Sequence, residues 1–131
     1  MSKTRQGLAM SLKPKHYDLE AWKEAMRLAR QLYEATQAMP ESERFGLCLQ
    51  MRRSAVSIAS NIAEGAGRGT KAEFRRYAQI ARGSLTELDT QIWIASDMKL
   101  IERTPQIVDR LTLVFRLLNG LISQKSAKSK L

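Results

Sequence analysis

The chain has 131 residues, of which 44% are hydrophobic and 27% charged, and its formal net charge is +9. This length and composition predict one folded domain and exclude an intrinsically disordered chain, which has too few hydrophobic residues to form a core. The single cysteine excludes an intrachain disulfide and a cysteine-based zinc site, and the single histidine leaves little room for a Ser-His or Cys-His catalytic pair.

Hydropathy along the chain predicts no contact with a membrane. The most apolar segment, residues 111–122, is too short to span a bilayer and is interrupted by Arg116 and Asn119. The basic N-terminus lacks the apolar core of a secretory signal. A single unpaired cysteine, Cys48, agrees with a reducing compartment, so we expect a cytoplasmic protein. We also expect this cysteine to be a small buried residue.

The first two predicted helices follow from apolar residues at helical spacing. The first covers residues 19–39, with Asp18 as its N-cap, and Pro40 ends the segment. Its apolar arc is wide and combines two stripes, which include Trp22, Met26 and Tyr33 on one side and Ala25, Leu28 and Leu32 on the other. The second helix begins near Phe45 or Gly46 and ends in the glycine-rich stretch 65–69.

The last two predicted helices carry clear start signals. Thr70 and Glu73 form a capping box for the third helix, which runs to about Met98, and Thr104 with Pro105 starts the fourth. Short connections predict an all-α fold, an antiparallel up-down-up-down four-helix bundle over residues 17–123. A flexible basic arm, 1–16, and a flexible basic tail, 124–131, flank it. The wide apolar arcs of the first and fourth helices fit either a large core or a subunit interface.

Several motifs in this order resemble the family of 23S rRNA intervening-sequence proteins. The main one is the run from Arg52 to Gly65, RRSAVSIASNIAEG, followed by Gly67-Arg68 and Glu73-Phe74. The other matching pieces are Asp18-Leu19 with Trp22, residues 43–47 and residues 83–91. The resemblance covers residues 17–122. It departs from the family pattern at Ala59, where proline is frequent, and it says nothing about residues 1–15.

The resemblance implies a left-handed four-helix bundle that assembles into a ring, a homopentamer. The accessory variability proteins of diversity-generating retroelements are similar to the same family. Those relatives are basic pentamers that bind nucleic acid and a reverse transcriptase. The resemblance implies no established biochemical activity for the intervening-sequence branch itself.

Positive charge gathers in both ends of the chain and in one internal segment. Residues 1–15 carry a charge of +4 and residues 124–131 a charge of +3, with no acid in either stretch. Segment 52–82 has seven cations and two acids, and arginine, which predominates, suits phosphate geometry. These seven are the candidate nucleic-acid-binding residues: Arg52, Arg53, Arg68, Lys71, Arg75, Arg76 and Arg82.

A strip of these cations along the outside of the second and third helices is one prediction. With a turn centred near Gly67, Arg52 and Arg82 are expected at similar heights in the bundle. Such a strip would contact the phosphates of RNA or DNA without reading bases. The alternative is that some arginines pair with acids within or between subunits, the candidates being Glu64, Glu73, Glu87 and Asp89. The residues support both about equally, and the resemblance favours binding.

A second group of polar residues lies near the seam of the same two helices. We predict that they form a structural hydrogen-bond network between helices or subunits: Asn61, Glu64, Ser84, Glu87 and Gln91. A di-iron bundle needs two Glu-x-x-His pairs, so with one histidine we expect no metal and no cofactor.

The glycine-rich loop 65–71 lacks the order of a phosphate-binding P-loop, because Lys71 follows Thr70 and the loop follows a helix. A helix cap is favoured there over a site for one phosphate. Trp22 and Trp93 fall on or beside core stripes, and their positions favour packing over base stacking.

Taken together, the residues and the resemblance predict a non-enzymatic homo-oligomer that binds structured RNA or DNA through its phosphate backbone. No motif supplies a nucleophile with its base or a metal site, so we expect no enzyme. The alternative is a protein-interaction scaffold, in which the basic surface meets a protein partner.

Overall fold

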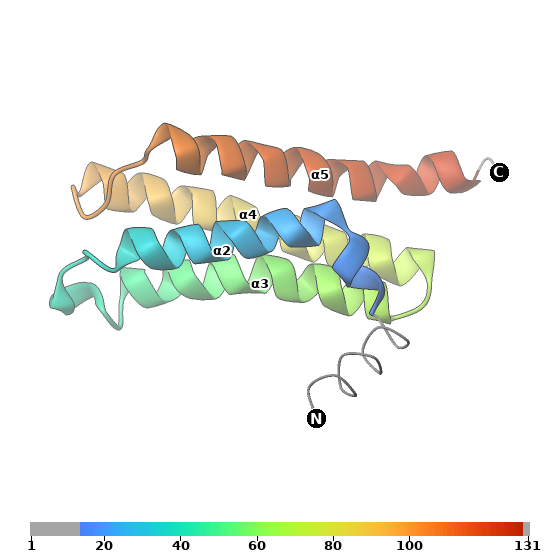
Figure 1. Cartoon of the computed structure of the whole chain (residues 1–131), viewed down its shortest axis with the longest axis horizontal. Helices are drawn as coiled ribbons and strands as arrows, with labels where there is room; N and C mark the ends of the chain where they lie inside the picture. Colours follow the sequence, from blue (N-terminus) through green and yellow to red (C-terminus); the bar gives the residue numbers. More distant parts are fainter. Residues whose placement is uncertain (1–13, 130–131) are drawn as a thin grey trace, which may run out of the picture.

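The computed structural model describes the backbone of residues 14–129 and the side chains of residues 14–123. The elements in chain order are η1 (Lys15–Asp18), α2 (Glu20–Thr36), η2 (Glu41–Glu43), α3 (Leu47–Gly67), α4 (Lys71–Asp97) and α5 (Pro105–Ser129). The four long helices lie side by side, and each runs opposite to the one before it (Figure 1). The predicted all-α four-helix bundle is therefore confirmed for the described residues.

The helices pack in a closed cycle in which α3 contacts α2 and α4, and α5 contacts α4 and α2. Each helix turns one apolar stripe inward, because leucines, isoleucines and alanines recur every three or four residues. The largest fully buried side chains come from all four helices: Leu28, Leu32, Met51, Ile58, Ile62, Leu88, Ile92, Val114 and Leu118. Cys48 is also buried, as predicted.

Of the three N-cap residues predicted from the sequence, two are confirmed. Thr70 accepts a hydrogen bond from the backbone N–H of Glu73, and Thr104 accepts one from that of Ile107. The predicted cap at Asp18 is wrong, since this residue ends η1 and Leu19 precedes the first turn of α2. Leu19 holds that position because its side chain packs against the core.

Helix α3 ends within the predicted stretch 65–69, whereas α5 ends beyond its predicted position. Helix α3 continues through Gly65 to Gly67, and the left-handed residue of the following turn is Gly69, with φ of 89°. Helix α5 continues to Ser129, through most of the predicted C-terminal tail. The N-terminal arm lies mostly outside the described residues, and its last two residues belong to η1.

The two stripes of α2 have different surroundings. Ala25, Leu28 and Leu32 are buried, whereas Met26 and Tyr33 are exposed. The second stripe therefore lies in the core, whereas these two residues of the first stripe do not. Trp93 on α4 is also exposed, at 48%, although its position favoured packing. The wide apolar arcs thus leave hydrophobic side chains on the surface of the described bundle.

Candidate nucleic-acid interface

Hydrogen bonds between α3 and α4 set their register. The hydroxyls of Ser57 and Ser84 are 2.9 Å apart, and the hydroxyl of Ser54 donates to Glu87 at 3.3 Å. When this pairing is extended along the two antiparallel helices, Arg52 lies at the same height as Asp89. Arg52 and Arg82 are then offset by about two helical turns, or about 10 Å. Their predicted equal height is wrong, because the turn is centred near Gly69 and Thr70 and not near Gly67.

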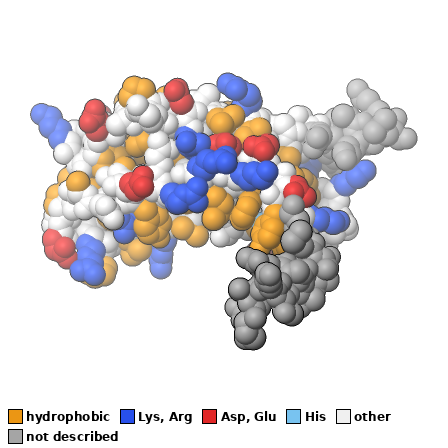
Figure 2. All heavy atoms as spheres, viewed as in Figure 1, with side chains coloured by type: hydrophobic (Ala, Val, Ile, Leu, Met, Phe, Trp, Pro, Cys, Tyr) orange, Lys and Arg blue, Asp and Glu red, His pale blue; other side chains and the backbone are white. Residues whose placement is uncertain are grey.

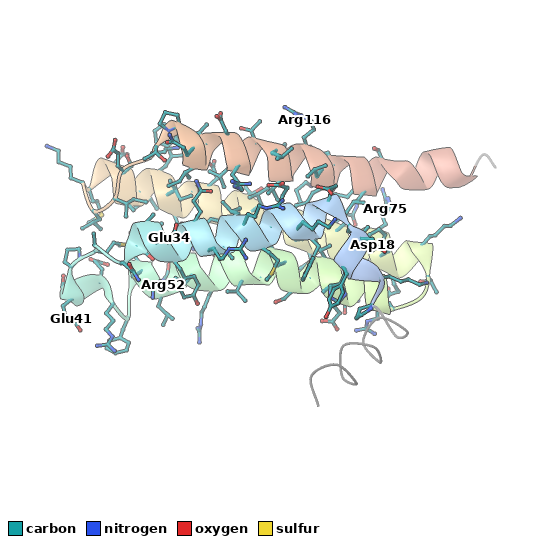
Figure 3. All side chains as sticks on the ribbon, viewed as in Figure 1. Asp18, Glu34, Glu41, Arg52, Arg75 and Arg116 are labelled. Carbon is teal, nitrogen blue, oxygen red and sulfur yellow. The ribbon has the colours of Figure 1, made fainter. Side chains whose placement is uncertain are left out.

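Arg52 lies in the groove between α2 and α3 (Figure 3). Its Nε donates to the hydroxyl of Thr36 at 2.8 Å, and one terminal nitrogen donates to the carbonyl of Tyr33 at 3.2 Å. Its guanidinium also sits over the Tyr33 ring, 4.4 Å from the centroid. All of these partners are neutral, so Arg52 joins two helices and keeps its charge uncompensated.

Arg75 and Arg82 lie in the groove between α4 and α5, across the bundle from Arg52. The Nε of Arg75 donates to the carbonyl of Ile122 at 3.1 Å, and Arg82 donates to the side-chain carbonyl of Asn119 at 2.8 Å. Both partners are again neutral. The seven cations therefore do not form one strip on a single face of the bundle.

Arg68 and Arg76 lie near the turn between α3 and α4, and both contact Tyr77. Arg68 donates to Glu64 at 3.2 Å and to the Tyr77 hydroxyl at 2.6 Å. Arg76 donates to Glu73 at 3.0 Å, and its guanidinium is 4.7 Å from the centroid of the Tyr77 ring. These two arginines follow the predicted alternative, in which cations of this segment pair with Glu64 and Glu73.

The hydrogen bond from Arg76 lowers the pKa of the Glu73 carboxyl below its ordinary value, against the opposing effect of desolvation. Because the pKa is lower in the folded state, the pair stabilises the folded state at pH values above the ordinary pKa of the carboxyl group. This contribution is lost as the pH falls through the lower value of the folded state. It is small, because both side chains are substantially exposed.

Replacing Arg76 with glutamine is expected to return the pKa of Glu73 toward its ordinary value, since the donor of the charged hydrogen bond is removed. A carboxyl-carbon NMR titration measures this shift. The matched control is Arg44→Gln, which removes a distant exposed pair with Glu41 and is expected to leave Glu73 unchanged. An unaltered Glu73 titration in the Arg76 variant would contradict the assignment.

Arg53 and Lys71 are exposed and have no ion-pair partner among the described residues. Arg53 borders a polar pocket of about 340 Å³ between α3 and α4. Lys71, at the start of α4, borders another pocket together with Lys15 of η1. Lys15 belongs to the predicted N-terminal arm, and the structure places it near the start of α4. This is the loop for which the sequence favoured a helix cap over a site for one phosphate.

The predicted polar network divides into separate groups. Asn61 donates to the carbonyl of Ser57 at 2.8 Å, and Ser57 reaches Ser84 across the seam. Glu64 belongs instead to the cluster around Tyr77. Gln91 is 8% exposed, and its Oε1 has no hydrogen-bond partner in the described structure.

Sequence reasoning missed Ser54 and Ser57, which join the two helices of this seam. The two serines are three residues apart and share a helix face with Asn61, and this spacing could have placed them in the predicted network. Among the described residues, no group of His, Cys, Asp or Glu is arranged to hold a metal ion. The helices of the described part of the chain also lack an apolar stretch of the length that a bilayer span requires.

Charges of opposite sign are mixed on the face that carries α2. Figure 2 shows Lys and Arg side chains gathered near the middle of this face, with acidic side chains beside them. Arg27 of α2 and Arg110 of α5 both form ion pairs with Glu24. The cations of this face are therefore partly neutralised, in contrast to Arg75 and Arg82 on the groove between α4 and α5.

Comparison with known proteins identifies one family. A search of curated proteins gives no match. The model of the family described as 23S rRNA-intervening sequence protein matches residues 17–120, which include all four long helices up to Gly120 of α5. This range also contains every residue discussed above on α3 and α4. The chain therefore belongs to the 23S rRNA-intervening sequence protein family.

Proposed function

We propose that the chain is a non-enzymatic homo-oligomer that binds the phosphate backbone of RNA or DNA. The observation that carries this proposal is the charge left uncompensated on α3 and α4. Within the described residues, only Arg68 and Arg76 of the seven candidate cations pair with a carboxylate. The other five have neutral partners or no partner, and such charge attracts a polyanion.

The edge of α4 that faces α5 is the strongest part of this surface. Lys71, Arg75 and Arg82 follow one another on this edge, at helical spacing. The hydrogen bonds of Arg75 and Arg82 to α5 fix each guanidinium and use only one of its five N–H donors. Phosphate binding then costs little side-chain entropy, because these arginines are already ordered.

The test compares two double variants of the full chain with the unmodified chain. Binding of a fluorescent RNA hairpin is measured by anisotropy across a potassium chloride series. Arg75→Gln with Arg82→Gln is expected to reduce the slope of log affinity against log salt by about two, because two phosphate contacts are lost. Arg75→Lys with Arg82→Lys keeps both charges and is expected to retain most of that slope.

A control in the tail separates this surface from the chain ends. Lys128→Gln with Lys130→Gln removes the same charge outside α3 and α4. The proposal is contradicted if this control lowers the salt slope and the Arg75 and Arg82 glutamine variant does not. Equal slopes for all variants would contradict it as well.

Exposed hydrophobic side chains support the oligomer and also a second candidate function, docking of a protein partner. Four of them lie on the outer faces of α2 and α3, and Phe45, before α3, is 80% exposed. The four are Met26, Tyr33, Leu49 and Val56. We propose that copies of the chain meet through this surface in a ring, a pentamer. Light scattering of Val56→Asp tests this: a shift to a smaller mass supports it, and an unchanged oligomer contradicts it.

A further inference from the structure

A pocket of about 340 Å³ opens between α4 and α5, beyond the basic edge described above. Its walls are mainly apolar and come from Leu85 on α4 and from Val108, Leu111 and Phe115 on α5. The polar part of the lining consists of two threonines, Thr86 and Thr112, and two charged residues, Asp89 and Arg103. The volume is at the lower end of those that hold small molecules, and an apolar wall with few polar groups is typical of such sites.

Arg103 is held in this pocket with little hydrogen bonding. Its guanidinium carbon is 3.9 Å from the centroid of the Trp93 ring, so the aromatic ring supports one face of the cation. Its Nε is buried and has no hydrogen-bond partner in the described structure. Its nearest carboxylate oxygen, on Asp89, is 3.6 Å from a terminal nitrogen, which is longer than a hydrogen bond.

This arrangement leaves an ordered guanidinium with unused donors beside an apolar space. A planar guanidinium presents its N–H groups in a fork that matches a carboxylate. The Asp89 carboxylate lowers the local positive charge without accepting a short hydrogen bond. A ligand carboxylate would therefore compete with Asp89 for Arg103, while an attached apolar group would fill the space between Leu85 and Phe115.

We propose that this pocket binds a small organic acid, with its apolar group between α4 and α5 and its carboxylate on Arg103. The site lies outside the seven candidate nucleic-acid-binding residues. It gives the bundle a place for a small anionic ligand that is separate from the polyanion surface on the same pair of helices.

The test uses 4-phenylbutyrate and its neutral amide, 4-phenylbutyramide, as probes of the full chain by isothermal titration calorimetry. The acid is expected to bind saturably, one molecule per chain, about tenfold more tightly than the amide, because only the acid can form a charged pair. Arg103→Gln is expected to abolish this preference. Asp89→Asn is expected to strengthen binding of the acid, because it removes the competing carboxylate.

The matched control is Arg116→Gln, which removes an exposed arginine of α5 that points away from the bundle (Figure 3). It is expected to leave both affinities unchanged. If Arg103→Gln does not fold, as judged by circular dichroism, Thr112→Phe keeps Arg103 and fills the pocket, and it is expected to abolish binding of both probes. Three results would overturn the proposal: no saturable binding of the acid, equal affinities for acid and amide, or weaker binding of the acid in Asp89→Asn.

Discussion

Replacing Gly65 with alanine is expected to destabilise the bundle, although alanine is the better helix former. A methyl group at this position would lie 2.7 Å from the Cβ of Tyr77 and 3.3 Å from the backbone carbonyl of Phe74. Neither atom is at the end of a flexible side chain, so α3 and α4 must move apart. Overpacking of this kind costs about 1–3 kcal/mol, against a helix-propensity gain of about 0.5–1 kcal/mol.

The matched control is Gly83→Ala, which is expected to stabilise the bundle instead of destabilising it. Gly83 lies within α4, is exposed, and has no atom within 4 Å of an added methyl group. It is therefore expected to gain about 0.5–1 kcal/mol from helix propensity alone. Thermal unfolding followed by circular dichroism measures both variants. A rise in midpoint for Gly65→Ala would contradict the close packing of α3 on α4.

Reversing the charges of Lys71, Arg75 and Arg82 to glutamate is expected to weaken RNA binding on the order of 100-fold at low salt. The change removes three attractive contacts with phosphate and replaces each with repulsion. The loss is expected to shrink as salt is added, because counterions screen both effects. Anisotropy with a labelled hairpin at two salt concentrations measures it.

The control for this triple variant reverses Lys23, Arg27 and Arg30 on α2, which changes the net charge equally. Lys23 and Arg27 pair with Glu20 and Glu24, and none of the three residues belongs to the proposed contact residues. Only a weaker, long-range loss is expected there. Equal losses in the two triple variants would show that net charge, and not the α4 edge, determines binding. Unfolding midpoints of both variants confirm that each remains folded.

The sequence predicts the helices of this protein well, because each is amphipathic and has local start signals. The Thr70 cap and the proline-led start of α5 depend only on neighbours in sequence. The register of α3 on α4 was missed, because it depends on where the turn residue adopts a positive φ. Gly65, Gly67 and Gly69 were equivalent in the sequence, and only the structure places that conformation at Gly69.

The candidate site was predicted by residue type and only partly by arrangement. Composition indicates an arginine-rich segment. It cannot show that Arg52 donates a hydrogen bond to Thr36 or that Arg75 donates one to Ile122, because those contacts join different helices. Periodicity likewise identifies Trp93 as apolar without showing that it is exposed on the described bundle. Its contact with Arg103 links α4 to the connection before α5, and no local pattern reports such a pair.

RNA binding by a full chain with neutral tails is the measurement that tests the central claim most directly. Six tail cations are replaced by glutamine in this variant, and Lys15, which lies near Lys71 in η1, is kept. The six are Lys3, Arg5, Lys13, Lys125, Lys128 and Lys130. If the cations of α3 and α4 contact phosphates, the variant still binds a labelled hairpin, with an affinity that falls steeply as salt rises. If binding is lost while the unmodified chain still binds, the chain ends carry the interaction and the proposed surface is contradicted.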